Sequence, residues 1–238
     1  MIAAVIAAVI ACVTSAALGH ATGRGLARFA GGPGSKDPRA QPSPLLAVLA
    51  VLGALAASGG LVQLALTPTD MTTRLVATLA GWLAALGTAR GLGIDLAWGR
   101  TGARSVGLGA ALGAVAAAVT YWVTHAGSHS HDPILVELAN GDASGRAGLA
   151  LYVILVAPAL EEAVMRGAVQ GQLARVSPGG AVLASTLLFA ALHPGTWGAR
   201  GPVIVLGLLA AGARHTTGRV LPAVAVHMAW NATVLALR

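Results

Sequence analysis

Charged side chains are scarce in this sequence. Asp, Glu, Lys and Arg make up 10% of the 238 residues, 56% are hydrophobic, and the mean hydropathy is +0.76. Because about a quarter of the residues in a soluble domain are charged, this scarcity excludes an ordinary soluble globular protein. It predicts a chain that crosses a membrane several times. No repeat and no change of composition marks off a second domain.

Cysteine and lysine are almost absent, since Cys12 and Lys36 are the single examples of each. One Cys inside an apolar run excludes a disulfide framework and gives no reason to expect thiol chemistry. The use of Arg in place of Lys, with abundant Ala and Gly, is typical of a GC-rich bacterial genome. The net charge of +7 is scattered between apolar runs, so it indicates membrane topology and no nucleic-acid partner.

Eight apolar segments are candidate membrane helices, because about 20 apolar residues cross roughly 30 Å of hydrocarbon. They are residues 1–18, 44–66, 75–92, 105–123, 147–173, 180–192, 202–213 and 220–237. We therefore predict an all-α fold, a polytopic bundle of about eight transmembrane helices, with seven or nine as alternatives. Segment 1–18 has no basic residue at its start, which favours a membrane helix over a signal peptide.

The distribution of Lys and Arg predicts the orientation of these helices. With the N-terminus outside the cell, most basic residues fall in cytoplasmic loops, including Arg24, Arg28, Lys36 and Arg39. This arrangement predicts a multi-pass protein of a bacterial plasma membrane. The long outside loop, residues 124–146, is predicted to be a solvated polar loop rather than a metal-binding tract, although it contains several His.

The stretch APALEEAVMRGAVQGQL places Glu161, Glu162 and Arg166 inside an apolar segment. Charges within a bilayer cost a few kcal/mol each on insertion scales, so these side chains should face a polar interior. Helical spacing predicts an ion pair between Glu162 and Arg166, which leaves Glu161 suited to take a proton from water. Pro158 should free the carbonyl of Ile154. The alternative is an ion pair that only packs helices, with a spare glutamate beside it.

Two later segments each place a pair of functional side chains four positions apart on a helix. LLFAALHPG sets Phe189 beneath His193, and AVAVHMAWNATVLAL sets His227 beside Asn231 in the last span. Buried imidazole and amide groups need hydrogen-bond partners, and either pair could simply join helices. Together with Glu161, they supply a base, its orienting groups and an oxyanion donor, which are the parts needed for hydrolysis.

The order Glu-Glu-x-x-x-Arg, Phe-x-x-x-His, His-x-x-x-Asn resembles the CPBP family of intramembrane proteases. This family includes the CAAX prenyl endopeptidases of the Rce1 type and bacterial proteins related to bacteriocin processing or immunity. The resemblance covers about residues 153–234, and all three motifs are intact. It implies a helical bundle with a water-accessible cavity inside the membrane. It also implies a catalytic core in residues 147–238 and variable helices in residues 1–146, within one integrated membrane domain.

The resemblance implies that the catalytic residues are Glu161, His193, His227 and Asn231, supported by Glu162, Arg166 and Phe189. Glu161 would activate the water that hydrolyses a peptide bond of a membrane-associated protein or peptide. His193 would position that water or shuttle its proton, and His227 with Asn231 would stabilise the oxyanion. We expect no cofactor. If a metal took part, Glu161, His193 and His227 would be the ligands of a zinc ion.

Two other functions are compatible with the residues. A non-catalytic bacteriocin-immunity or scaffold membrane protein of the same fold could use the motifs for binding. A proton-coupled transporter could use intramembrane Glu, His and Arg as a relay, but such proteins usually show internal repeats, and none is visible here. The expected partners are the lipid bilayer and a membrane-associated substrate.

Overall fold

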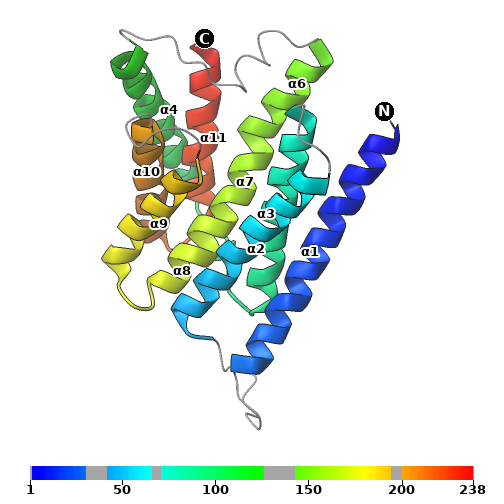
Figure 1. The fold of residues 1–238 in the computed structure, drawn as a ribbon. Helices are drawn as coiled ribbons and strands as arrows, with labels where there is room; N and C mark the ends of the chain where they lie inside the picture. The colour runs from blue at the N-terminus through cyan, green and yellow to red at the C-terminus, as the bar shows by residue number, and fades with distance from the viewer. Residues whose placement is uncertain (1, 31–41, 66–70, 126–142, 194–199, 238) are drawn as a thin grey trace. The chain divides into compact units, whose positions relative to one another are not determined.

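The computed structural model describes residues 2–30, 42–65, 71–125, 143–193 and 200–237 (Figure 1). This part of the chain is helical and contains no strand. Its eight helical rods coincide with the eight predicted spans, so the all-α fold class is confirmed. Most of the long loop that was predicted to be polar, with His129 and His131, lies outside the described residues.

The fifth rod is a composite of α-helical and π-helical stretches, whereas the other seven are single α-helices. The single helices are α1 (Ile2–Ala30), α2 (Pro44–Ala65), α3 (Met71–Gly91), α4 (Ala103–His125), α9 (Pro178–Leu192), α10 (Gly201–Thr217) and α11 (Leu221–Ala236). The composite rod consists of α6 (Ala143–Leu151), η1 (Tyr152–Val156), α7 (Ala157–Glu162), η2 (Ala163–Val169) and α8 (Gln170–Leu173). In this rod the helix changes from one register to another several times.

Three stretches of the described chain are long and apolar enough to cross a membrane by themselves. They are Pro44–Leu61, Ala103–Thr124 and Gly145–Leu173. The helices Pro178–Leu192 and Leu221–Ala236 are apolar but shorter, as the sequence predicts for the sixth segment. The protein is therefore a helical membrane bundle.

Contacts divide the chain into two compact units. Unit 1 comprises Met1–Leu96 and Ala163–Ser177, and unit 2 comprises Ala97–Glu162 and Pro178–Arg238. The boundary thus falls inside the composite rod, directly after the second glutamate. The sequence-based division into residues 1–146 and 147–238 stays a prediction.

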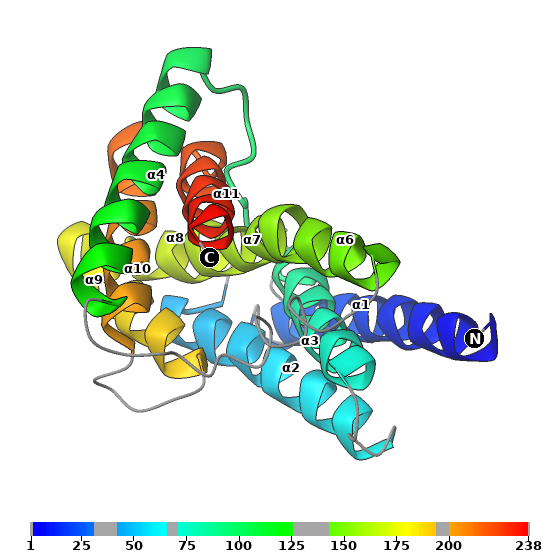
Figure 2. The ribbon, with the colours of Figure 1, turned by 90° about the horizontal axis from the view of Figure 1, so that it is seen from above.

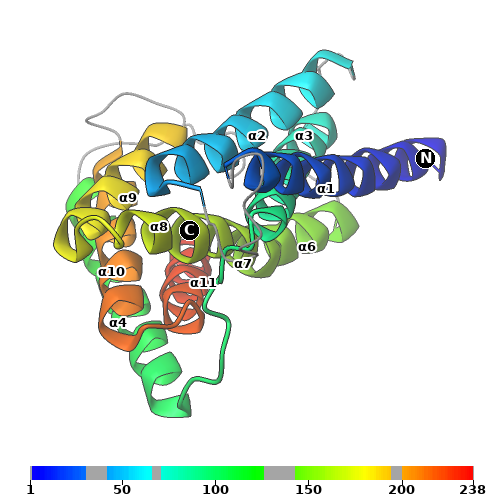
Figure 3. The ribbon, with the colours of Figure 1, turned by 90° about the horizontal axis from the view of Figure 1, so that it is seen from below.

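In unit 1, α3 packs against both α1 and α2 (Figures 1 and 3). Glycines spaced four apart, Gly19 and Gly23 on α1 and Gly87 and Gly91 on α3, line the contact between α1 and α3. A Cβ atom at any of the four would collide with a backbone carbonyl of the facing helix. Small residues at such spacing let membrane helices approach closely, which is how these two spans associate.

In unit 2, α11 packs against α4 and α10, and α9 packs against α10 (Figure 2). Gly109 and Gly113 bring α4 close to α11, since a Cβ at either position would meet the carbonyl of Pro222 or Val226. Close packing of this kind fixes α11 along its length. The side chains that α11 carries are therefore held in a defined position.

The start of α11 is fixed by the turn that precedes it. Gly218 ends α10 in a left-handed conformation with φ 68°, and its N–H donates to the carbonyl of Arg214. The N–H of Val220 donates to the carbonyl of Ala97 across 3.2 Å. Around this point a small core joins α11 to α7, formed by Ala97, Val220 and Val224 with Ala159 and Met228.

Candidate active site

The two adjacent carboxylates lie at the end of α7, between two π-helical stretches. η1 ends one residue before α7 begins, and η2 follows directly after Glu162. The Glu162 side chain is fully buried, whereas Glu161 retains 13% of its side-chain exposure. π-helical turns are rare and are found frequently at functional sites. The two π-helical stretches that flank this point therefore mark Glu161, whose side chain is partly exposed, as a candidate catalytic residue.

His227 of α11 faces both carboxylates. Its Nδ1 lies 2.9 Å from Oε1 of Glu162, and its Nε2 lies 3.9 Å from Oε2 of Glu161. An ionised carboxylate only accepts hydrogen bonds, so Nδ1 donates to a charged Glu162 and the ring turns Nε2 towards Glu161. The contact to Glu161 is longer than a hydrogen bond and is electrostatic in character.

Phe189 of α9 contacts both imidazoles of the predicted site. Its ring centroid lies 4.5 Å from that of His193 and 5.7 Å from that of His227, with edge-on geometry in both cases. Phe189 is fully buried, so its ring is held in a fixed position against the two imidazoles. The predicted packing of Phe189 against His193 is confirmed, and the contact with His227 adds to it.

The His193 ring is also oriented by a hydrogen bond on its own helix. Its Nδ1 lies 2.8 Å from the carbonyl oxygen of Phe189. A carbonyl can only accept, so Nδ1 carries a hydrogen. In the neutral imidazole, Nε2 is then the nitrogen that has a lone pair for a water molecule or a proton.

Asn231 binds the backbone of the composite rod rather than another side chain. Its Nδ2 donates to the carbonyl of Val153 across 2.8 Å. The N–H of Ala157 donates to the carbonyl of Tyr152, five residues earlier, in the π-helical register of η1. In that register the missing N–H of Pro158 leaves the carbonyl of Val153 without a helical donor. The carbonyl of Val153 is thus one that Pro158 leaves free, and the freeing of the Ile154 carbonyl, which α-helical spacing predicts, stays a prediction.

Most of the predicted site residues come together in unit 2. The contacts connect Glu161, Glu162, His227, Phe189 and His193. Glu162 is bound by His227, a contact that spacing along one helix could not reveal. The Val153 carbonyl was also missed, because a backbone group leaves no mark in the sequence except for the proline five positions later.

Arg166 is fully buried, as the prediction of an intramembrane polar cluster requires. It lies in η2, on the other side of the unit boundary from Glu162. Its predicted ion pair with Glu162 stays a prediction.

A catalytic zinc site needs three protein ligands that converge on one ion. Among the described residues, no group of three or more His, Cys, Asp or Glu side chains is arranged to hold a metal ion. Glu161, His193 and His227 therefore do not form the three-ligand set that a catalytic zinc needs. We derive no step of the reaction through a metal.

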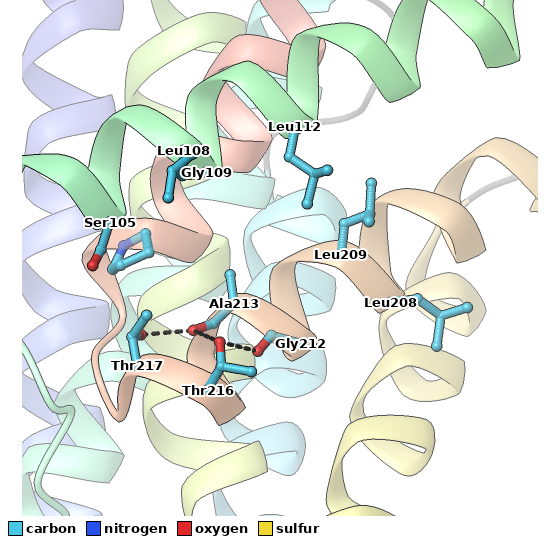
Figure 4. A pocket seen from close by; sticks show the side chains of 11 residues that line it. Ser105, Leu108, Gly109, Leu112, Leu208, Leu209, Gly212, Ala213, Thr216 and Thr217 are labelled. Carbon is cyan, nitrogen blue, oxygen red and sulfur yellow. Dashed lines mark hydrogen bonds between the residues drawn. The ribbon is translucent and has the colours of Figure 1, made fainter.

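A cavity of about 370 Å³ lies between α4 and α10, next to the start of α11 (Figure 4). Its lining consists of Ser105, Leu108, Gly109, Leu112, Leu208, Leu209, Gly212, Ala213, Thr216, Thr217 and Pro222. These residues do not include any of the predicted site. The water-accessible cavity that the family resemblance implies around Glu161 stays a prediction.

Comparison with protein families bears on the segment that contains these contacts. Residues 143–233 match the family model described as type II CAAX prenyl endopeptidase Rce1-like. This segment is Rce1-like. It contains all three motifs, from Glu161 to Asn231, which confirms the family resemblance. Comparison with curated proteins and with solved structures gives no match.

The Rce1-like match indicates the class of activity. At the level of the family, it supports a CAAX-type intramembrane endopeptidase, and hence a protease. The long apolar helices agree with this class, because they make the chain a membrane protein. A protease of the membrane acts on membrane-associated substrates.

Proposed function

We propose that this protein hydrolyses a peptide bond of a membrane-associated protein or peptide with a water molecule that Glu161 activates. The position of His227 between the two carboxylates supports the proposal most strongly. It provides a partly accessible base, Glu161, beside an imidazole whose far nitrogen is held by a buried carboxylate, Glu162. Such a pairing of groups is typical of sites that move protons.

In the proposed reaction, Glu161 takes a proton from water while the water oxygen attacks the carbonyl carbon of the substrate. Negative charge then forms on the carbonyl oxygen. His227 carries hydrogen on both nitrogens from the start of the reaction, because Glu162 stabilises its positive charge, and it donates from Nε2 to the oxyanion. The proton held by Glu161 passes to the leaving amine as the C–N bond breaks. His193 positions the water through Nε2.

Glu161→Gln tests this assignment, because it keeps the shape of the side chain and removes only the basic oxygen. In a peptide-cleavage assay with the protein reconstituted in lipid, we expect kcat to fall by roughly 10²–10⁴-fold. The variant should unfold at the same temperature as the wild-type protein. Glu137→Gln, the same chemical change outside the three motifs, serves as the control and should cleave normally. Normal turnover by Glu161→Gln would show that another group is the base.

We also propose that the reaction needs no metal. The support is the arrangement of the side chains, since Glu161, His193 and His227 are not grouped as ligands. Prolonged dialysis against a chelator should therefore leave kcat unchanged, with less than one zinc per ten protein molecules by elemental analysis. Loss of activity on chelation and its return with zinc would contradict this part of the proposal.

The substrate can be identified by comparing cells that carry the wild-type protein with cells that carry Glu161→Gln. New peptide termini in the membrane proteome of the wild-type cells alone would name the cleaved proteins. If the protein instead acts in bacteriocin immunity by binding, immunity should survive Glu161→Ala. We place the protein in a bacterial plasma membrane with its N-terminus outside, because the Lys and Arg residues follow that arrangement.

A further inference from the structure

Asn231 connects α11 to the composite rod at a point where the rod lacks a hydrogen bond of its own. The π-helical bond from Ala157 to Tyr152 sets the register, and Pro158 cannot donate the next bond, to Val153. The Asn231 amide donates there instead, across 2.8 Å. A backbone carbonyl left without a partner in hydrocarbon is unfavourable, so this contact has a clear stabilising role.

The same two elements meet at a second point, which is part of the proposed site. His227 and Asn231 lie four residues apart on α11, and they contact Glu162 and Val153 of the rod. Two contacts on one helix face fix both the rotation and the position of that face. If the contact to Val153 were lost, the packing of α11 against α4 would remain, but His227 would lose the hydrogen bond, one turn away, that fixes this face of α11 against the rod.

We propose that Asn231 is a positioning residue that supplies the hydrogen bond Pro158 withholds from Val153, and so holds His227 beside the two glutamates. The sequence predicts Asn231 as an oxyanion donor, but the structure commits one of its two amide hydrogens to Val153. The catalytic consequence rests on the proposed endopeptidase function. The structural role does not.

A double-mutant cycle distinguishes a positioning role of Asn231 from a role as oxyanion donor. Asn231→Leu removes the donor at similar volume, and Pro158→Ala restores a backbone N–H to the rod. In the wild-type background, we expect Asn231→Leu to lower the folding equilibrium constant about three- to tenfold. In the Pro158→Ala background, where the rod can supply its own donor, the loss should be less than twofold. Unfolding in detergent measures both without any need for a substrate.

An oxyanion donor would behave differently. It would lower kcat equally in both backgrounds and leave the folding equilibrium unchanged, and this result would overturn the inference. If Pro158→Ala fails to fold, the ¹³C shift of the labelled Val153 carbonyl in Asn231→Leu gives the answer. A change towards the value of a free carbonyl is expected, and an unchanged shift would overturn the inference. If the two substitutions are coupled in the unfolding measurement but the wild-type protein cleaves no substrate, the protease function alone would be refuted.

The cavity between α4 and α10 carries a second, independent inference. Leu108, Leu112, Leu208 and Leu209 line its apolar part, and Ser105, Thr216 and Thr217 line the part nearest the ends of the two helices (Figure 4). Leu108 and Leu112 are exposed, so the apolar part opens outwards. Its volume of about 370 Å³ lies within the range of about 300–1,000 Å³ found for small-molecule sites.

Arginines adjoin, along the chain, the residues that line the polar part of this cavity. Arg104 precedes Ser105 on α4, and the Arg219 backbone N–H lies 3.3 Å from the hydroxyl of Thr217. Residues 97–105 and 211–222 contain further Arg but neither Asp nor Glu. Basic pockets between membrane helices are known to bind anionic lipid head groups. An apolar slot with hydroxyl groups at one end, next to arginines in the chain, matches the chemistry of one lipid molecule along its length.

The geometry points to a site for an anionic phospholipid, with one acyl chain among the leucines and the phosphate group near Arg104 and Arg219. Native mass spectrometry of the protein with phosphatidylglycerol or phosphatidylcholine tests this. We expect phosphatidylglycerol to be retained at least fivefold better. The double variant Arg104→Gln with Arg219→Gln should remove that preference.

Leu112→Trp should fill the apolar part and reduce retention of phosphatidylglycerol severalfold. Val119→Trp is the matched control, since Val119 is an exposed residue of the same helix outside the cavity lining. Retention that is equal for both lipids, or a loss that is the same for Leu112→Trp and Val119→Trp, would overturn the inference. A second copy of this chain as the occupant would appear as a dimer that Leu112→Trp disrupts, which would also overturn it.

Discussion

At the scale of single residues, the two histidines of the site are held in the same way. Nδ1 of His227 is bound by Glu162, and Nδ1 of His193 is bound by the carbonyl of Phe189. In both rings an acceptor fixes the near nitrogen, so Nε2 is the atom available for the reaction. The Phe189 ring packs in T-shaped geometry against both imidazoles and limits their rotation. The site thus has two oriented imidazoles, and that of His227 lies beside Glu161.

Glu162 should be required for the rate although it does not touch the substrate. In Glu162→Gln the amide oxygen can still accept from His227, but the charge that stabilises the imidazolium is gone, so we expect kcat to fall roughly tenfold with KM little changed. Glu162→Leu leaves Nδ1 of His227 without its acceptor and should lower kcat roughly 100-fold. Steady-state kinetics of the two variants in lipid measures both effects. Equal, small effects would mean that Glu162 only stabilises the fold.

Sequence patterns point to the side chains of the candidate site but not to all of their contacts. All three motifs could be recognised because they combine polar residues with apolar surroundings. Spacing along a helix reveals only neighbours on the same helix, such as Arg166 for Glu162, and that ion pair stays a prediction. The contact of Glu162 with His227, 65 residues away in the chain, could not be predicted in this way. The role of Val153 depends on a backbone carbonyl, for which no side chain gives a signal.

At the scale of the elements, seven of the eight segments were predicted within a few residues of their ends, whereas the first helix continues past residue 18 to Ala30. Apolar length is sufficient for this, because each span needs a long run without charge. The π-helical stretches were not predicted, since hydropathy is the same in either register. Pro158 was the one sign of a change, and its effect on the carbonyl of Val153 could not be predicted from α-helical spacing. The glycine contacts between α1 and α3 were also missed, although the spacing of Gly19 and Gly23 is typical of such contacts.

The contact between α4 and α11 should influence activity, because it supports the helix that carries His227. A methyl group at Gly113 would collide with the carbonyl of Val226, the residue before His227. Gly113→Ala should therefore displace α11, destabilise the protein by about 1–3 kcal/mol and reduce kcat. Gly107→Ala on the same helix meets no atom within 4 Å and should be neutral or slightly stabilising. Equal unfolding temperatures and rates for the two variants would contradict this account.

At the scale of the whole molecule, composition alone established the class of protein. A chain with 10% charged residues and long apolar runs has few alternatives to a helical membrane bundle. Its division into two units could not be predicted, because that division depends on contacts between distant segments. The boundary within the composite rod, after Glu162, lies in the middle of a continuous apolar segment, where the sequence shows no change of composition.

The orientation of the whole chain in the membrane is testable with cysteine labelling. Basic residues are retained on the cytoplasmic side, and the segment that contains Lys36 and Arg39 is rich in them, whereas the segment around Ser128 has none. In a Cys12→Ala background, Ser128→Cys should react with an impermeant maleimide in intact cells. Lys36→Cys should react only after the cells are permeabilised, which also serves as its positive control. The opposite pattern would place the N-terminus in the cytoplasm. It would also move the arginines beside the α4–α10 cavity to the outer leaflet, where fewer anionic lipids are expected to meet them.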